Sequence, residues 1–157
     1  PVPELNILRG QPIDFTNIPL SETDEVFDVQ GLALDITAEF EVAGSVGLAL
    51  ACSPDGSEQT RIMYDPETQR LIVNREQSSL APGNETFVNE AAHELAPGET
   101  LQLRILLDGS VLEIIANGRT SLVSRIYPSR ADSQGIRLFG QGVLKTLSIW
   151  PMSSIWT

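Results

Sequence analysis

Short alternating segments separated by tight-turn signals constrain this chain more than any other feature of its sequence. Asp108-Gly109 and Asn117-Gly118 are dipeptides typical of β-hairpin turns, and apolar and polar residues alternate around them. Helical periodicity is confined to residues 1–10, which predict one or two helical turns. The remainder predicts about ten or more short strands. The chain is therefore expected to be all-β, a two-sheet antiparallel β-sandwich of the lectin-like jelly-roll type.

Glycine and turn residues also suggest where strands end. The alternating segment 31–42 and the apolar segment 45–52 are expected to be separate strands. Gly140-Gln141-Gly142 is expected to separate the last two strands, residues 135–140 and 142–150.

The composition is that of one acidic globular domain. The chain has 157 residues, of which 41% are hydrophobic, and a formal net charge of −11. Such a charge is repelled by phosphate backbones and anionic lipids, so nucleic acid is not an expected partner. No run approaches the roughly 20 apolar residues that span a bilayer, so no membrane segment is expected. Neutral ligands such as sugars remain compatible with this charge.

Residues that commonly carry catalysis or bind metals are scarce. Cys52 is the only cysteine and His93 the only histidine, so neither an internal disulfide nor a cysteine-based metal site is predicted, and no cofactor is expected. We expect His93 to be a core or surface residue rather than a general base, because no G-x-S-x-G motif accompanies it. Asn84 begins an Asn-Glu-Thr sequence and is a possible N-glycosylation site.

The hairpin turns predict the register of a three-strand meander. If Asp108-Gly109 is a two-residue turn, Arg104 lies directly opposite Glu113. One face, expected to be the core face, then carries Leu101, Leu103, Ile105, Leu107, Leu112 and Ile114. The other face carries Gln102, Arg104, Leu106, Val111, Glu113 and Ile115. A two-residue turn at Asn117-Gly118 adds Thr120, Leu122, Ser124 and Ile126 to this second face.

Three interpretations of Arg104 and Glu113 follow. The pair fixes the strand register as a cross-strand ion pair that contributes up to ~1 kcal/mol. Alternatively, the two side chains bind vicinal hydroxyl groups of a sugar. A catalytic carboxylate of a glycosidase would need a second carboxylate roughly 5 to 9 Å away, and the stretch offers none. The semi-apolar character of this face indicates that another domain, a ligand or the other sheet covers it.

The motifs around these strands resemble a known family. Asp108-x-Ser110-x-x-Glu113, Asn117-Gly118 and Ser124-Arg125-Ile126-Tyr127-Pro128 occur in the order found in the C-terminal β-sandwich module of glycoside hydrolase family 32. This family includes invertases, inulinases, levanases and fructan exohydrolases. Residues 64–79 and the start of the chain are similar to further stretches of the family. Asn74 and Ile115 depart from its pattern.

The resemblance implies a module without catalytic residues of its own. The motifs typical of the family's catalytic five-bladed propeller do not occur in this sequence. Residues 1–10 are then an interdomain linker and residues 11–157 the sandwich, whose expected partner is the N-terminal propeller of a β-fructofuranosidase-type hydrolase acting on sucrose or fructans. The module would stabilise that propeller. Alternatively, it binds fructans or sucrose-derived sugars, and the candidate residues are Arg75, Arg104, Asp108 and Glu113. The expected location is secreted or extracellular.

Overall fold

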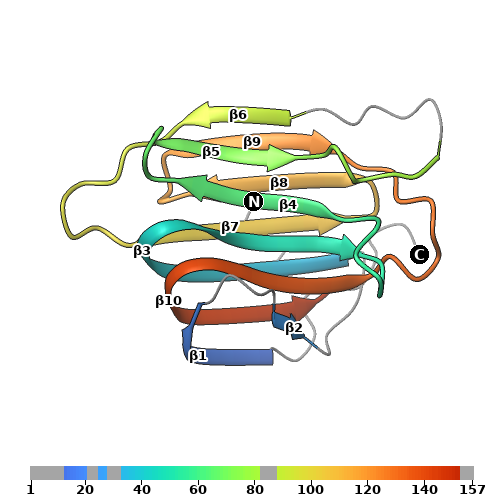
Figure 1. The fold of residues 1–157 in the computed structure, drawn as a ribbon, viewed down its shortest axis with the longest axis horizontal. Helices are drawn as coiled ribbons and strands as arrows, with labels where there is room; N and C mark the ends of the chain where they lie inside the picture. The colour runs from blue at the N-terminus through green and yellow to red at the C-terminus, as the bar shows by residue number, and fades with distance from the viewer. Residues whose placement is uncertain (1–12, 21–24, 28–32, 82–87, 153–157) are drawn as a thin grey trace.

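Strands make up the regular structure of the chain. The computed structural model describes residues 13–20, 25–27, 33–81 and 88–152, and no helix occurs among them (Figure 1). The ten strands are β1 (Ile13–Pro19), β2 (Glu25–Phe27), β3 (Ala33–Cys52), β4 (Thr60–Asp65), β5 (Arg70–Asn74), β6 (Val88–Ala92), β7 (Leu101–Asp108), β8 (Val111–Ala116), β9 (Thr120–Arg125) and β10 (Gly135–Pro151). The all-β prediction is confirmed. The helical turns predicted near the N-terminus lie outside the described residues.

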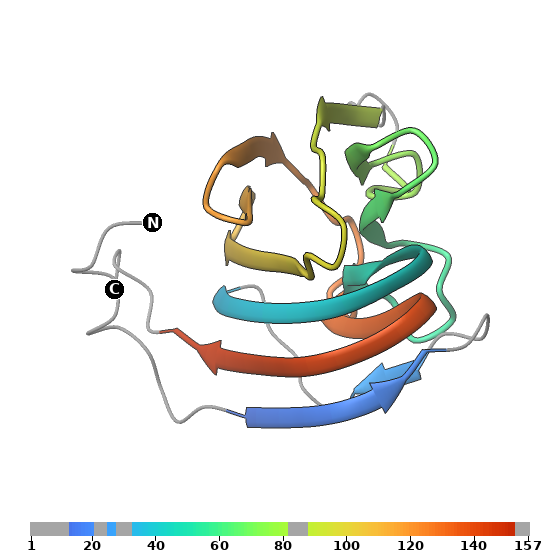
Figure 2. The same ribbon diagram turned by 90° about the vertical axis from the view of Figure 1, so that its left-hand side faces the viewer.

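The strands form two antiparallel layers, as predicted (Figure 2). The first sheet has the order β1–β10–β3–β7–β8–β9. The second has the order β2–β10–β3–β4–β5–β6. β3 and β10 therefore belong to both sheets, and their continuous pairing joins the layers along one side.

The two shared strands are long and change sheet midway. β3 has 20 residues and β10 has 17. Residues 34–42 pair with residues 142–151 in the first sheet, and residues 46–52 pair with residues 135–140 in the second. The prediction of separate strands on either side of Gly140-Gln141-Gly142 was therefore wrong, and so was the division of β3 into two strands. Hydrogen bonding resumes across both bends.

Two glycines make the bend of β10 possible. Gly140 and Gly142 have φ angles of 127° and 138°, which L side chains rarely adopt. A Cβ atom on Gly140 would collide with the carbonyl oxygen of Ser45, and one on Gly142 with that of Glu41. The register shifts between the two glycines, as in a β-bulge that increases the local bend. Close contact between the two backbones at this corner thus requires glycine.

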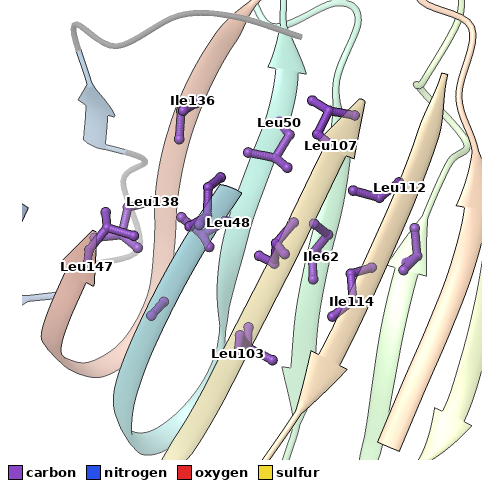
Figure 3. Packing of buried hydrophobic residues seen from close by; sticks show 14 of the residues in the cluster. Leu48, Leu50, Ile62, Leu103, Leu107, Leu112, Ile114, Ile136, Leu138 and Leu147 are labelled. Carbon is purple, nitrogen blue, oxygen red and sulfur yellow. The ribbon is translucent and has the colours of Figure 1, made fainter. Parts of the chain in front are cut away.

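The hydrophobic core fills the space between the layers. Tyr64 and Phe40 are its largest fully buried side chains. Figure 3 shows members of this core from both layers, among them Leu48, Leu50, Ile62, Leu103, Leu107, Leu112 and Ile114. The six residues that the sequence predicted for the core face of β7 and β8 are at most 3% exposed. Period-two alternation therefore identified the buried face correctly.

The β7–β8 hairpin differs from the predicted register by two residues. Asp108 pairs with Val111, so the two-residue turn is Gly109-Ser110 rather than Asp108-Gly109. Arg104 therefore lies opposite Ile115, not opposite Glu113 as predicted. A shift of two residues leaves every side chain on its predicted face, because side chains alternate with a period of two.

The β8–β9 hairpin differs by one residue, with larger consequences. Ala116 pairs with Thr120, so the loop has three residues, and two of them, Asn117 and Gly118, have positive φ angles of 49° and 66°. The prediction that Leu122 shares the face of Glu113 was wrong. Thr120, Leu122, Ser124 and Ile126 instead lie on the core face, and Val123 lies opposite Glu113 and is 65% exposed. A one-residue shift reverses every side chain of a strand.

We expect Gly142→Ala to lower the free energy of unfolding by about 2 kcal/mol or more, because the new Cβ meets backbone atoms at an unfavourable φ. The matched control is Gly98→Ala, which also has a positive φ, 81°, but has no atom within 4 Å of the new Cβ. Its expected cost is about 1 kcal/mol. Urea unfolding of both variants measures the difference. Equal losses of stability in the two variants would show that glycine is needed at position 142 for its backbone conformation alone and not for close contact at the corner.

Candidate functional site

The outer face of the first sheet carries an ion pair with a buried carboxylate, which the sequence analysis did not identify. Asp35 of β3 is fully buried, and its carboxylate accepts hydrogen bonds from Arg104 Nε at 3.3 Å and Nη2 at 2.9 Å. Trp150 and Leu106 flank Asp35 in the β-ladder. A two-point contact with a carboxylate fixes the plane of the guanidinium group. Arg104 is thus held on this face by a neighbouring strand.

A hollow of about 490 Å³ lies beside Arg104. Its lining residues come from β3, β7, β8, β10 and the β8–β9 loop and are Thr37, Ala38, Glu39, Gln102, Leu103, Arg104, Ile115, Gly118 and Thr146. Glu39 in this lining accepts a hydrogen bond from Thr100 Oγ1 at 2.6 Å. The hollow combines charged, amide and hydroxyl groups with an apolar strand surface.

The structure does not gather the four predicted sugar-binding residues at one place. Arg104 and Glu113 share the outer face of the β7–β8 pair. Asp108 ends β7, where it pairs with Ala33 and Val111. Arg75 is only 4% exposed.

Arg75 links the two sheets. Its Nη1 donates a hydrogen bond of 2.7 Å to the carbonyl of Arg125 at the end of β9. Of the predicted set, only Arg104 lines the hollow beside β7. The predicted glycosylation site Asn84 lies outside the described residues.

A second buried carboxylate, Glu58, ties three loops together. It is fully buried and accepts hydrogen bonds from the backbone N–H groups of Leu80, Ser129 and Arg130 and from the hydroxyls of Ser129 and Ser133. Burial on its own would raise the pKa of Glu58, but these hydrogen bonds outweigh it and hold the pKa at about 2. Glu58 is therefore a charged structural group at neutral pH.

His93 is buried, and both of its ring nitrogens have hydrogen-bonding partners. The sequence analysis expected a core or surface position, and the structure has the core position. Its Nδ1 lies 2.7 Å from Thr120 Oγ1 and its Nε2 lies 3.0 Å from Asn117 Oδ1. The Tyr64 hydroxyl donates to the His93 carbonyl at 2.8 Å, and the two rings meet edge to face. Burial raises the pKa of the Tyr64 hydroxyl. These contacts connect the segment after β6 with the β8–β9 loop and leave His93 a structural role.

No helix among the described residues has the length and apolar character needed to cross a membrane. No group of three or more His, Cys, Asp or Glu side chains in the described part is arranged to hold a metal ion.

Comparison with known proteins agrees with the fold. A family model described as "Glycosyl hydrolases family 32 C terminal" matches residues 4–151. The chain is 30% identical over 170 residues to a levanase of Bacillus subtilis (strain 168), and the match covers 99% of this chain but 24% of the levanase. It is 32% identical to beta-fructofuranosidase 1 of Zea mays over 71% of this chain and 19% of that protein.

Solved structures show the same architecture. Fructan 1-exohydrolase IIa from Cichorium intybus superposes with a TM-score of 0.85 at 22% identity, over 98% of this chain and 37% of that one. A fructosyltransferase from A. japonicus superposes with a TM-score of 0.81 at 24% identity, over 94% of this chain and 27% of that one. The protein is thus an antiparallel two-layer β-sandwich, and the family model matches it over nearly its whole length. The chain belongs to the family of glycosyl hydrolase family 32 C-terminal domains. It spans about a quarter of the length of the levanase.

We expect acid to weaken the fold through Glu58. Its pKa falls on folding from the usual 4.5 to about 2, so its contribution to stability is complete above pH 4.5 and is lost as the pH falls towards 2. This 2.5-unit difference corresponds to about 3 kcal/mol. Glu58→Gln should lower the free energy of unfolding by a similar amount at pH 7. The variant should also lose the decrease in stability between pH 4.5 and pH 2 that is due to Glu58. Urea unfolding between pH 2 and 7 measures both.

Glu99→Gln is the control, because the pKa of Glu99 is also held at about 2, by hydrogen bonds from Arg119 and the Ala96 backbone, but the pair is partly exposed. Its effect should be smaller and should decrease in high salt. Equal effects of the two substitutions would contradict a special role for the buried carboxylate.

Proposed function

We propose that this chain is the non-catalytic C-terminal sandwich of a β-fructofuranosidase-type glycoside hydrolase that acts on sucrose or fructans. Its role is to stabilise an N-terminal catalytic propeller by packing against it. The family assignment and the names of the relatives support this type of parent enzyme. The match to about a quarter of the levanase is consistent with a larger partner domain within one polypeptide.

The observation that carries this proposal is the apolar surface on the outer face of β7, β8 and β9. Val123 is 65% exposed and Val111 36% exposed, and Leu106 and Ile115 lie partly buried on the same face. We call these four residues the apolar strip. In the ladder Glu113 lies between Leu106 and Val123, so the apolar strip shares its face with charged side chains. Apolar residues bordered by polar ones are typical of surfaces that meet another domain.

The polar groups of this face favour a fixed docking surface. The two hydrogen bonds between Arg104 and Asp35 connect β7 to β3 beside the apolar strip. A side chain that is already held loses less conformational entropy when a partner covers it. The face is thus preorganised for contact with a rigid domain.

The proposal includes the domain division and the location expected from the sequence. Residues 1–10 serve as the linker to the propeller, and residues 11–157 form the sandwich. The relatives include an acid beta-fructofuranosidase 2 of a rose cultivar that is named as vacuolar. Proteins of vacuoles and of the extracellular space share the secretory route, so entry of the parent enzyme into that route is part of the proposal.

An alternative function is sugar binding at the hollow beside Arg104. Its size and its mixture of Arg, Glu, Gln and Thr side chains favour this alternative. The two-point contact of Arg104 with Asp35 argues against it, because a sugar would have to compete for the same guanidinium group. We therefore give priority to the docking role.

We expect Val123→Asp to destabilise the full-length enzyme by about 2 kcal/mol or more relative to Val88→Asp, because it would bury a charge in the domain interface. Both valines are exposed residues of outermost strands, β9 and β6. In the 157-residue chain both substitutions should cost up to about 1 kcal/mol, the range of β-propensity. Thermal unfolding of both proteins tests this. Equal behaviour of the two full-length variants would argue against docking through β9.

We expect no sugar to bind at the hollow beside Arg104. A nuclear magnetic resonance titration of the 157-residue chain with fructose or a short inulin should leave the amide signals of residues 102–115 unchanged at about tens of millimolar ligand, where a millimolar site would saturate. Glu113→Gln should cost roughly 1 kcal/mol or less. Shifts in residues 102–115 that disappear in Gln102→Ala, a substitution in the lining of the hollow, would instead support the binding function.

A further inference from the structure

The outer face of the second sheet, on the opposite side of the molecule, carries two adjoining hollows. One, of about 470 Å³, lies at the corner where β3 and β10 change sheet, and its lining residues are Gly44, Ser45, Arg61, Met63, Asp65, Pro66, Glu67, Phe139, Gly140 and Gln141. The other, of about 260 Å³, is lined by Gln59, Arg61, Asn74, Glu76 and Gln77. Arg61 of β4 belongs to both linings, so the two hollows form one groove across β4 and its neighbours, which we call the Arg61 groove.

The corner end of the groove has an apolar floor. Phe139 and Met63 both lie opposite Gly47 in the ladder, so no side chain separates them on this face. Phe139 is only 5% exposed, and the Arg61 guanidinium carbon lies 3.8 Å from the centre of its ring. This stacking holds the guanidinium flat against the sheet, which lowers the entropy lost when its N–H groups bind a ligand.

Carboxylate and amide side chains surround this floor. The carboxylate of Asp65 is fixed by hydrogen bonds from the Glu67 backbone N–H at 3.0 Å and the Thr68 hydroxyl at 3.1 Å. Glu67 and Gln141 are exposed at the edge of the hollow. A fixed carboxylate keeps free lone pairs that accept from ligand hydroxyls.

The far end of the groove holds a buried acceptor that has no donor. Gln59 Nε2 donates to the carbonyl of Gly56 at 3.1 Å and to Gln77 Oε1 at 3.3 Å, whereas Gln59 Oε1 is buried and has no hydrogen-bond partner among the described residues. Buried acceptors are nearly always satisfied in folded proteins, by protein groups, by water or by a ligand. Gln59 lines the hollow, so rotation of its side-chain amide would bring this oxygen to a ligand hydroxyl.

From this arrangement we infer that the Arg61 groove binds a short neutral oligosaccharide. Amide, carboxylate and guanidinium groups together match vicinal hydroxyls, which donate and accept at once. Met63 and the Arg61 guanidinium stacked on Phe139 give this end a partly apolar surface that matches the C–H face of a sugar ring. The net charge of −11 disfavours an anionic ligand. The inference concerns the face away from the apolar strip, so it does not depend on the docking role.

The test is a titration of the isotope-labelled 157-residue chain with the fructan trisaccharide 1-kestose, and with maltotriose as a second neutral probe. At least one probe should shift the amide signals of residues 44–45, 59–67, 74–77 and 139–141, with a dissociation constant of about millimolar strength. Absence of shifts from both probes at about 50 mM, or shifts confined to other residues, would overturn the inference.

Substitutions localise the effect. Arg61→Lys keeps the charge but loses the planar fork, and it should weaken binding at least about tenfold. If this variant does not fold, the double substitution of the exposed Glu67 and Glu76 by Gln takes its place and should weaken binding similarly. Glu90→Gln is the matched control, because Glu90 is exposed on the same face, opposite Ile72, but lines neither hollow. An equal loss in Glu90→Gln would contradict the site.

The full-length enzyme provides the last control. The same probes should shift the same amide signals when the full-length enzyme is isotope-labelled in this 157-residue part alone, and Arg61→Lys should weaken these shifts. Binding by the 157-residue chain but not by the full-length enzyme would overturn the inference, because the groove would then be a contact surface for another part of the protein. Loss of docking through β9 would leave this result unchanged, so the two proposals fail separately.

Discussion

The continuous pairing of β3 with β10 is the interaction on which the rest of the sandwich depends. Each strand crosses from one sheet to the other, and β1, β2, β4 and β7 all pair with one or the other of them. Because hydrogen bonding resumes on both sides of the corner, few backbone groups lose a partner where the chain bends. The bend in turn requires close backbone contact at Gly140 and Gly142, where any side chain would collide. Two glycines thus determine how the layers face each other across one core.

Polar contacts join parts of the sandwich that no ladder connects. Glu58 joins three loops, His93 joins the segment after β6 to the β8–β9 loop, and Ser124 of β9 donates to Asn89 of β6 at 3.2 Å. Such groups add stability only when every donor and acceptor is matched. They also define one arrangement of the loops, whereas apolar contacts alone tolerate several. The β3–β10 ladder therefore provides backbone hydrogen bonding, and the polar contacts select one arrangement of the loops.

Local pattern was sufficient to predict the all-β fold and the core face of β7 and β8, and insufficient for anything that depends on distant pairing. Alternation identified the buried residues of β7 and β8, because every second residue of a strand lies on the same face and no distant partner has to be known. The β8–β9 loop was misjudged by one residue, and the faces of β9 were reversed. Asp35 and Glu58 were not recognised as buried, because their partners lie 69 residues away in Arg104 and 71 in Ser129. Two strands were each divided at a bend, because a glycine at a bulge and a glycine in a turn have the same sequence signal.

A sandwich whose inner faces are both used for the core has two outer faces left for function, and here they differ in chemistry. The outer face of the first sheet combines the apolar strip with an ion pair whose acceptor, Asp35, is fully buried. That of the second sheet stacks Arg61 on Phe139 and surrounds it with amides and carboxylates. A face with exposed apolar residues and a fixed ion pair is suited to a permanent domain contact, and a polar groove is suited to a ligand that exchanges with water. About 10 Å of packed core separates two sheets of this kind, so groups on the two faces have no shared partners and act independently. Docking through the first sheet, as proposed, would therefore leave the groove of the second sheet available to a ligand.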